Sequence, residues 1–214
     1  MSNNFRQEFI QFAIAKNVLC FGEFKTKAGR LSPYFFNAGL FNDGQSLAKL
    51  GEFYAKAIIA AGVDVDMLFG PAYKGIPLVA SISIALASMG HNLPFAFNRK
   101  EAKDHGEGGV IVGAALKNRV LIVDDVISAG TSVRESVQLI RGQKAEAAGV
   151  AIALDRMEKG TGDLSAVQEV QQNFQIPVIS IATLNDLQEY LSANKVSSDI
   201  YSKVIRYRET YGVN

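Results

Sequence analysis

The sequence predicts an α/β fold in which a parallel central sheet is flanked by helices. Short apolar runs rich in β-branched residues, such as Val120 to Val123, alternate along the chain with longer segments of helical periodicity. Continuous apolar runs of this kind are typical of strands that are buried on both faces of a parallel sheet. The chain has 214 residues, of which 48% are hydrophobic and 20% charged. These values fit one globular domain, spanning 1–214, with a substantial core.

The N-terminal part of the chain predicts a helix, a hairpin and a second helix. Phenylalanines recur at roughly helical spacing over residues 5–12, which predicts a helix that packs on the domain. Residues 21–39 contain strand-like pieces around a Lys/Gly turn, so we expect a small antiparallel hairpin over the ligand edge of the sheet. A helix follows over residues 43–61, with Asp43 and Gly62 as its caps.

The rest of the chain predicts alternating strands and helices around a small hood. We expect residues 1 to about 40 and the C-terminal region to form the hood. The segment Arg99 to Gly109 carries alternating charges and three glycines, so it predicts neither a helix nor a strand. A long loop inside a compact domain is more often functional than inert. Strands are expected over 66–70, 94–98, 120–123, 147–154 and 177–182, and helices over 78–89, 164–174, 184–191, 198–211 and after Gly130.

Bulk properties exclude several classes of protein. A net charge of +1 argues against a nucleic-acid partner, which normally requires a basic excess. Met1 to Lys16 lacks the pattern of a signal peptide, and serines interrupt the apolar stretch from Gly75 to Gly90, so we expect no membrane span. The single cysteine, Cys20, cannot form an internal disulfide and suits a reducing cytoplasm. We expect a cytoplasmic protein in which Cys20 is a small buried hydrophobe and not a catalytic thiol.

The chemistry gathers in the turn after the strand over 120–123. Two adjacent carboxylates, Asp124 and Asp125, end the strand, and small and hydroxyl residues lead into a helix. Gly130 permits a positive φ, and the amides and hydroxyls of residues 128–132 would face a phosphate at the helix N-terminus. The carboxylates can accept hydrogen bonds from a sugar diol or help to hold a hydrated Mg²⁺. The pattern lacks the lysine of a P-loop and predicts a ribose 5-phosphate site.

Two further loops end at the same edge of the predicted sheet. The glycine-proline loop over 70–77 carries Lys74, whose ammonium suits a departing pyrophosphate, although a tight turn with a surface lysine has the same pattern. Arg156 follows the strand over 147–154 and can fork onto a substrate carboxylate. A surface ion pair is the alternative for this arginine.

Cations in the segment over 99–109 favour its interpretation as a lid over a pyrophosphate. They are Arg99, Lys100, Lys103 and His105. A general base is the alternative role for His105, but a histidine in a flexible, glycine-flanked loop rarely holds a fixed geometry. Anion binding is therefore the better interpretation.

Residues 120–132, Val-Leu-Ile-Val-Asp-Asp-Val-Ile-Ser-Ala-Gly-Thr-Ser, resemble the signature for 5-phosphoribosyl pyrophosphate (PRPP) of the type I phosphoribosyltransferase family. Ser128 is often threonine in that family, and the hydroxyl is retained. Further pieces are similar, in the same order, to the bacterial orotate phosphoribosyltransferase family. These pieces are residues 27–37, 69–77, 97–109 and 154–156, and the resemblance extends from about Phe5 to Tyr211.

The resemblance implies the type I phosphoribosyltransferase fold and a specific reaction. The 5-phosphoribosyl group of PRPP is transferred to N1 of orotate in de novo pyrimidine (UMP) biosynthesis, giving orotidine 5′-monophosphate and pyrophosphate. Mg²⁺ is the implied cofactor, held mainly through PRPP oxygens and water, with Asp124 or Asp125 as an additional ligand. The resemblance also implies a strained or cis peptide around Ala72-Tyr73, and a homodimer in which lid residues reach the neighbouring chain's active site.

The resemblance also assigns roles to individual residues. We expect Lys74, Lys103, Asp124 and Asp125 to be catalytic: the cations stabilise departing pyrophosphate, and the acids hold the ribose diol and favour an oxocarbenium-like state. The implied orotate contacts are Lys27, Phe35, Phe36, Ser128 and Arg156. The implied PRPP contacts are Lys27, Tyr73, Lys74, Arg99, Lys100, Lys103, His105, Asp124, Asp125, Val126, Ile127, Ser128, Ala129, Gly130, Thr131 and Ser132.

Two other functions compete with this one. A phosphoribosyltransferase for another base, such as uracil or a purine, would keep the signature, but it would not need Arg156 to meet a carboxylate. A PRPP-sensing regulator without catalysis would keep the phosphate cradle and add a nucleic-acid-binding module or a basic face, which the net charge of +1 disfavours.

Overall fold

The computed structural model describes residues 4–26, 28–103, 109–160, 162–194 and 197–213, with Ala102 and Lys103 described by their backbone only. No helix within these ranges is long and apolar enough to cross a lipid bilayer. The strands are β1 (Leu19–Lys25), β2 (Leu31–Phe36), β3 (Met67–Gly70), β4 (Phe95–Lys103), β5 (Gly109–Gly113), β6 (Arg119–Val123), β7 (Glu146–Asp155) and β8 (Val178–Thr183). The helices are α1 (Asn4–Ala15), α2 (Gly44–Ala61), α3 (Gly75–Ser88), α4 (Thr131–Gly142), α5 (Ala166–Phe174), α6 (Leu184–Ala193) and α7 (Ser198–Tyr211), with a short 3₁₀ turn, η1 (Ala38–Leu40).

The central sheet has six strands in the order β5-β4-β3-β6-β7-β8, and all neighbours except β4 and β5 run parallel. From β3 the chain passes to β4 on one side and then to β6 on the other, so the strand order reverses between β3 and β6. In open α/β sheets, ligands bind outside the carboxyl ends of the strands at this kind of switch point. The topology therefore directs attention to the loops after β3 and β6. The α/β class predicted from the sequence is confirmed.

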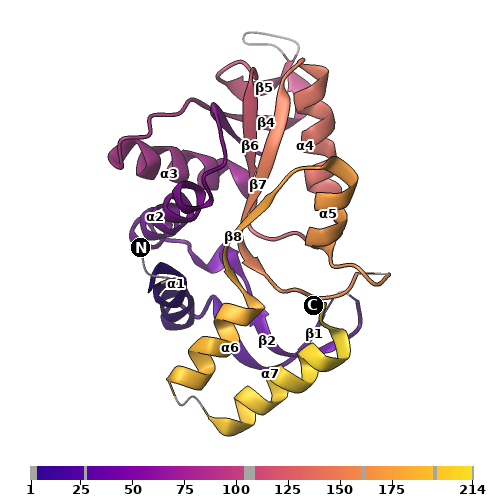
Figure 1. The fold of residues 1–214 in the computed structure, drawn as a ribbon. Coiled ribbons are helices and arrows are strands. Elements are labelled where there is room, and N and C mark those ends of the chain that lie inside the picture. The colour runs from indigo at the N-terminus through magenta and orange to yellow at the C-terminus, as the bar shows by residue number, and fades with distance from the viewer. Residues whose placement is uncertain (1–3, 27, 104–108, 161, 195–196, 214) are drawn as a thin grey trace.

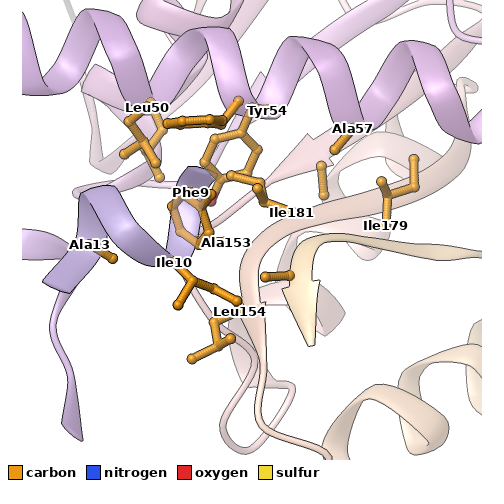
Figure 2. Close-up of a cluster of buried hydrophobic side chains, with 14 of the residues drawn as sticks. Phe9, Ile10, Ala13, Leu50, Tyr54, Ala57, Ala153, Leu154, Ile179 and Ile181 are labelled. Atoms are coloured by element: carbon orange, nitrogen blue, oxygen red, sulfur yellow. The ribbon is translucent and has the colours of Figure 1, made fainter. Parts of the chain in front are cut away.

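Helices cover both faces of the sheet (Figure 1). One buried cluster joins α1, α2 and α3 to one face, and a second joins α4 and α5 to the other. The first cluster contains Phe9 of α1, Leu50 and Tyr54 of α2, and Ile181 of β8, whose side chains lie together in Figure 2. Strands covered in this way lose nearly all contact with water, which is why the residues from Val120 to Val123 are completely buried.

The hood consists of the antiparallel pair β1 and β2 together with α6 and α7 (Figure 1). This confirms the hairpin predicted over residues 21–39. Tyr34 of β2 and Tyr207 of α7 belong to the same buried cluster as Leu121 of the central sheet. A shared core supports the interpretation of 1–214 as one domain, which stays a prediction.

Local signals placed α2 correctly. The Asp43 side chain accepts from the Ser46 amide at 2.8 Å, and Gly62 closes the helix in a left-handed conformation with φ of 63°. Both caps confirm the sequence prediction. Asp43 provides an acceptor for an amide that the helix start leaves without a partner. Gly62 adopts the left-handed conformation in which its own amide donates to the Ile59 carbonyl at the helix end.

The segment from Arg99 to Gly109 corrects the sequence prediction. The expectation of no regular structure is wrong for Arg99 to Lys103, which belong to β4, and the strand β5 was not expected. The pairing with β5 includes Ala96 to Asn98, is interrupted by a register shift, and resumes where Lys103 lies opposite Gly109. Cys20 is also a correction: it is only partly buried, and its thiol donates to the Asn17 carbonyl at 3.1 Å.

Candidate active site

The loops after β3 and β6 meet at the switch point of the sheet. Lys74, at the start of α3, places its Nζ 2.7 Å from Oδ2 of Asp125, which follows β6. The lysine side chain is 61% exposed, whereas that of Asp125 is 11% exposed. This contact confirms the expectation that the two loops share one edge of the sheet. It joins an exposed cation to a nearly buried anion.

The turn after β6 leads directly into α4. Gly130 has φ of 67°, the left-handed conformation that its lack of a side chain permits. Ser128, Ala129 and Thr131 are exposed around it, so their amides and hydroxyls are open to a ligand. Ile127 instead packs against the second buried cluster. The turn therefore has the open backbone that a phosphate cradle requires.

Asp124 lies deeper in the same turn. Its Oδ1 accepts from the Asp125 amide at 2.9 Å, and its Oδ2 accepts from the Ser132 hydroxyl at 2.9 Å. Burial and the neighbouring negative charge of Asp125 raise the pKa of Asp124 to about 6, although these hydrogen bonds oppose the rise. Ser132, which we expected to face a phosphate, donates to this carboxylate in the structure.

The loop after β3 is held tightly in place. A side chain on Gly70 would lie 2.1 Å from the Gly75 carbonyl oxygen, so only glycine fits where the loop closes. The Ala72-Tyr73 peptide is cis, as the resemblance implies. The Asn98 side chain on β4 accepts from the Ala72 amide at 2.8 Å. Asn98 was not predicted as a site residue, because nothing in its local sequence shows that β4 lies beside this loop.

Tyr54 is a second residue that the sequence analysis missed. It lies on α2 and is 1% exposed, and its hydroxyl donates to the Asp124 carbonyl at 2.7 Å. Burial raises the pKa of this phenol well above its ordinary value, so Tyr54 stays a neutral donor. In Figure 2 its ring lies among apolar side chains of the core. Tyr54 thus ties the carboxylate turn to the packed face of α2, and helical periodicity alone identified it only as a core residue.

Two hollows adjoin these loops. One has a volume of about 150 Å³, and its lining includes Lys74 and Asp125. The other, of about 330 Å³, is lined by Pro71, Ala72, Asn98, Lys100, Thr131, Ser132 and neighbouring residues of α4. Of the predicted PRPP contacts, Lys74, Lys100, Asp125, Thr131 and Ser132 therefore border open space.

Arg156 follows β7 and meets the hood. Its Nε donates to Oε1 of Glu158 at 2.8 Å, and its Nη2 donates to the Ser32 hydroxyl at 3.0 Å. The guanidinium carbon lies 4.3 Å from the centre of the Tyr34 ring. Arg156 thus forms the ion pair that we weighed as an alternative, but with side chains that are 22% and 15% exposed the pair does not lie at the surface. Arg156 forms a mostly buried pair instead.

The two phenylalanines predicted at the orotate slot lie on opposite sides of β2. Phe36 packs against the core, with its ring centre 6.3 Å from that of Phe9. Phe35 is 46% exposed, and its ring stacks on Phe24 with a centroid distance of 5.5 Å. Successive side chains on a strand alternate between faces, so the rings cannot line one slot from the same side. Their contact with orotate stays a prediction.

Several predicted residues cannot be placed in this site. Lys27 and His105 lie outside the described residues, as does the side chain of Lys103. The Arg99 guanidinium donates to the Gly109 carbonyl at 3.3 Å, across the pairing of β4 and β5. Within the described ranges, His, Cys, Asp and Glu side chains do not gather in groups of three or more that could hold a metal ion.

Comparison with known proteins gives the same assignment as this geometry. The model of the phosphoribosyl transferase domain matches residues 39–182, more than half of the chain. The chain is 67% identical to the orotate phosphoribosyltransferase of Thiobacillus denitrificans, over 99% of this chain and 100% of that protein. The Neisseria meningitidis enzyme of the same name is 64% identical, over 98% of this chain and 99% of its own length.

A solved structure agrees with these relatives. The crystal structure of orotate phosphoribosyltransferase from Francisella tularensis superposes with a TM-score of 0.88 at 47% identity, covering 96% of this chain and 99% of that one. The similarity thus includes the hood as well as the central sheet. The chain therefore belongs to the orotate phosphoribosyltransferase family.

Proposed function

We propose that this chain transfers the 5-phosphoribosyl group of PRPP to N1 of orotate, giving orotidine 5′-monophosphate and pyrophosphate for pyrimidine biosynthesis. The observation that carries the proposal is the meeting of Lys74 and Asp125 beside an open phosphate-type turn, in a chain 67% identical to an enzyme of that name. Lys74, a cation that suits a leaving group, and Asp125, a carboxylate that can accept from a sugar diol, lie at the same edge of the sheet. This is the arrangement that pentosyl transfer from a pyrophosphate requires.

The ribose 5-phosphate is assigned to the turn from Val126 to Ser132. Its exposed amides lie at the N-terminus of α4, where the helix dipole favours a negative charge. Tyr54 and the Ser132 hydroxyl hold Asp124 at the base of this turn. A sugar placed here would have its phosphate at the helix and its hydroxyls towards the two carboxylates.

The acids and the lysine stabilise different charges during the displacement. As the bond to pyrophosphate lengthens, positive charge develops on the ribose ring, and Asp124 and Asp125 favour it electrostatically. Lys74 is mostly exposed, so it can leave Asp125 and follow the charge that develops on pyrophosphate. Asp125 is then released to accept from the sugar diol. The nucleophile is N1 of the base, and no covalent intermediate with the protein is needed.

A Mg²⁺ ion fits this site if it is bound mainly through the substrate. Two neighbouring carboxylates are available, one of them already paired with Lys74, so most of the ion's oxygen ligands would come from PRPP and water. Asp124 or Asp125 would supply the protein ligand. Bound there, Mg²⁺ contributes neutralisation of the pyrophosphate charge.

The base is assigned to the end of β7 and the hood. Arg156 is the cation that a carboxylated base requires, and it lies against Ser32 of β2. Lys27, Phe35, Phe36 and Ser128 complete this assignment on the strength of the family resemblance. A base without a carboxylate would leave the arginine without its ligand, which favours orotate over uracil.

The lid cations and a second copy of the chain belong to the same proposal. Arg99, Lys100, Lys103 and His105 would close over pyrophosphate and exclude water, in part at the neighbouring chain's site. An apolar groove of about 590 Å³ between α2 and α3, next to the 69% exposed Ile84, supports pairing of two copies. The chain's single cysteine suits a cytoplasmic location.

One assay tests the reaction. The protein is mixed with Mg²⁺ and PRPP, and pyrophosphate release is followed with orotate, uracil or hypoxanthine as the base. We expect turnover with orotate and none above background with the other two bases. Turnover with uracil or hypoxanthine instead of orotate would contradict the base assignment. Binding of PRPP without turnover of any base would indicate the regulator that the sequence left as an alternative.

A further inference from the structure

The guanidinium of Arg156 is held on one side only. Glu158 accepts from its Nε at 2.8 Å and from its Nη2 at 2.5 Å, both through a single oxygen, Oε1. Ser32 takes a second bond from Nη2, and the Tyr34 ring supports the flat face. Among the described residues, no side chain accepts a hydrogen bond from Nη1, and the nearby Tyr207 hydroxyl is itself buried without a hydrogen-bond partner. The fork therefore presents one corner without a protein acceptor.

Backbone hydrogen bonds hold the segment around Glu158 in place. Met157, between the two, has φ of 50°, and its amide donates to Oδ1 of Asp155 at 2.8 Å. On the other side, the C-terminal end of the chain lies along this segment: the Lys159 amide donates to the Tyr211 carbonyl, and the Val213 amide donates to the Met157 carbonyl, both at 2.8 Å. Glu158 thus has little freedom to move away from Arg156.

The burial of the pair explains why a resident anion is needed. An arginine that is only 22% exposed would be a poorly solvated, unpaired charge whenever no substrate is bound. Glu158 supplies the counter-charge through Nε and Nη2, without using Nη1. A long side chain that is already fixed also loses less conformational freedom when a ligand binds.

We propose that Glu158 is the positioning residue that holds Arg156 for the carboxylate of the incoming base. This inference rests on the proposed function, because it takes a carboxylated base as the ligand of Arg156. Glu158 sets the orientation of the guanidinium and leaves Nη1 to donate to the substrate. Because Glu158 acts through the arginine, we expect its effect to be confined to the base.

Two substitutions at one position separate charge from position. Glu158→Gln keeps an acceptor oxygen and removes the charge, whereas Glu158→Ala removes both. We expect the KM for orotate to rise about 3-fold in the first variant and at least about 10-fold in the second, with the KM for PRPP unchanged within about 2-fold. Glu209→Gln, an exposed site on α7, is the matched control and should leave both constants unchanged.

The outcomes are distinguishable. A purely structural role would lower the thermal stability and affect both substrates equally, and that result would overturn the proposal. Unchanged orotate KM in a folded Glu158→Gln and Glu158→Ala pair would also overturn it. If the alanine variant does not fold, the glutamine variant alone tests the proposal. A rise in the KM for orotate, with the KM for PRPP unchanged, would support the proposal, and an unchanged KM for orotate would overturn it. Failure of the wild-type protein to use orotate would instead reject the proposed function.

Discussion

Two ion pairs lie at the candidate site, and their surroundings differ. Lys74 and Asp125 join loops at the switch point of the sheet, and the lysine side chain is 61% exposed. Arg156 and Glu158 lie between β7 and the hood, with side chains that are 22% and 15% exposed. The arginine also has the Ser32 hydroxyl and the Tyr34 ring as neighbours, whereas the Lys74 ammonium donates to Asp125 and, within the described chain, to no other side chain.

The difference separates a cation that can change partners from one that stays in place. An exposed ion pair contributes little to stability, because water solvates both partners when the pair opens. A mostly buried pair is costly to break, because the remaining charge is left without solvation. We infer that Lys74 moves between Asp125 and its ligand during the reaction, and that Arg156 offers a fixed corner. The following substitutions test this contrast.

Arg156→Ala should have the largest effect. It leaves Glu158 mostly buried and unpaired, so we expect the free energy of unfolding to fall by about 3 kcal/mol. Urea denaturation of the variant and the wild type measures this change. Adding Glu158→Gln to the variant should recover part of the stability without restoring orotate turnover. A loss below about 1 kcal/mol in Arg156→Ala would show that the pair is effectively solvated.

Lys74→Ala should affect catalysis more than stability. We expect kcat to fall about 100-fold, because the charge that develops on pyrophosphate loses its cation. The free energy of unfolding should change by no more than about 1 kcal/mol, since the lysine is largely exposed. Steady-state kinetics and urea denaturation measure the two quantities. Lys117→Ala, also exposed, is the control, and equal losses of activity in both variants would contradict the role of Lys74.

Asp124→Asn should change the pH dependence of the free energy of unfolding. The pKa of Asp124 is raised to about 6 in the folded protein, so the folded state holds a proton that the unfolded state has already lost. Stability therefore falls as pH rises from about 4 to about 6, and the penalty persists above that window. At pH 8 the asparagine variant should be more stable by about 2 kcal/mol, whereas at pH 4 the difference should vanish.

Urea denaturation at pH 8 and pH 4 measures this prediction. Asp163→Asn, at an exposed position, serves as the control and should change the stability little at either pH. The asparagine variant should also lose transferase activity at both pH values, since a neutral amide cannot favour positive charge on the ribose. An equal change in stability at both pH values would contradict the raised pKa of Asp124.

The sequence predicted much of the fold because the relevant signals are local. The caps of α2, the buried run of β6 and the left-handed glycine before α4 each follow from residues within one turn or strand. The charged part of β4 was missed for the opposite reason. Its alternating charges carry no strand signal, and its pairing with β5 resumes only at Lys103, opposite Gly109, after a register shift that no local pattern predicts.

By itself the sequence determined the α/β class, the carboxylate turn with Asp124 and Asp125, and the glycine-proline loop with Lys74, because strand ends and turns depend on residues at consecutive positions. Only the tertiary structure decided which side chains support them. The Tyr54 hydroxyl lies 70 positions from the carbonyl that it reaches, and Ser32 lies 124 positions from Arg156. Contacts over such separations depend on how helices and strands pack, and no local pattern of residues encodes them.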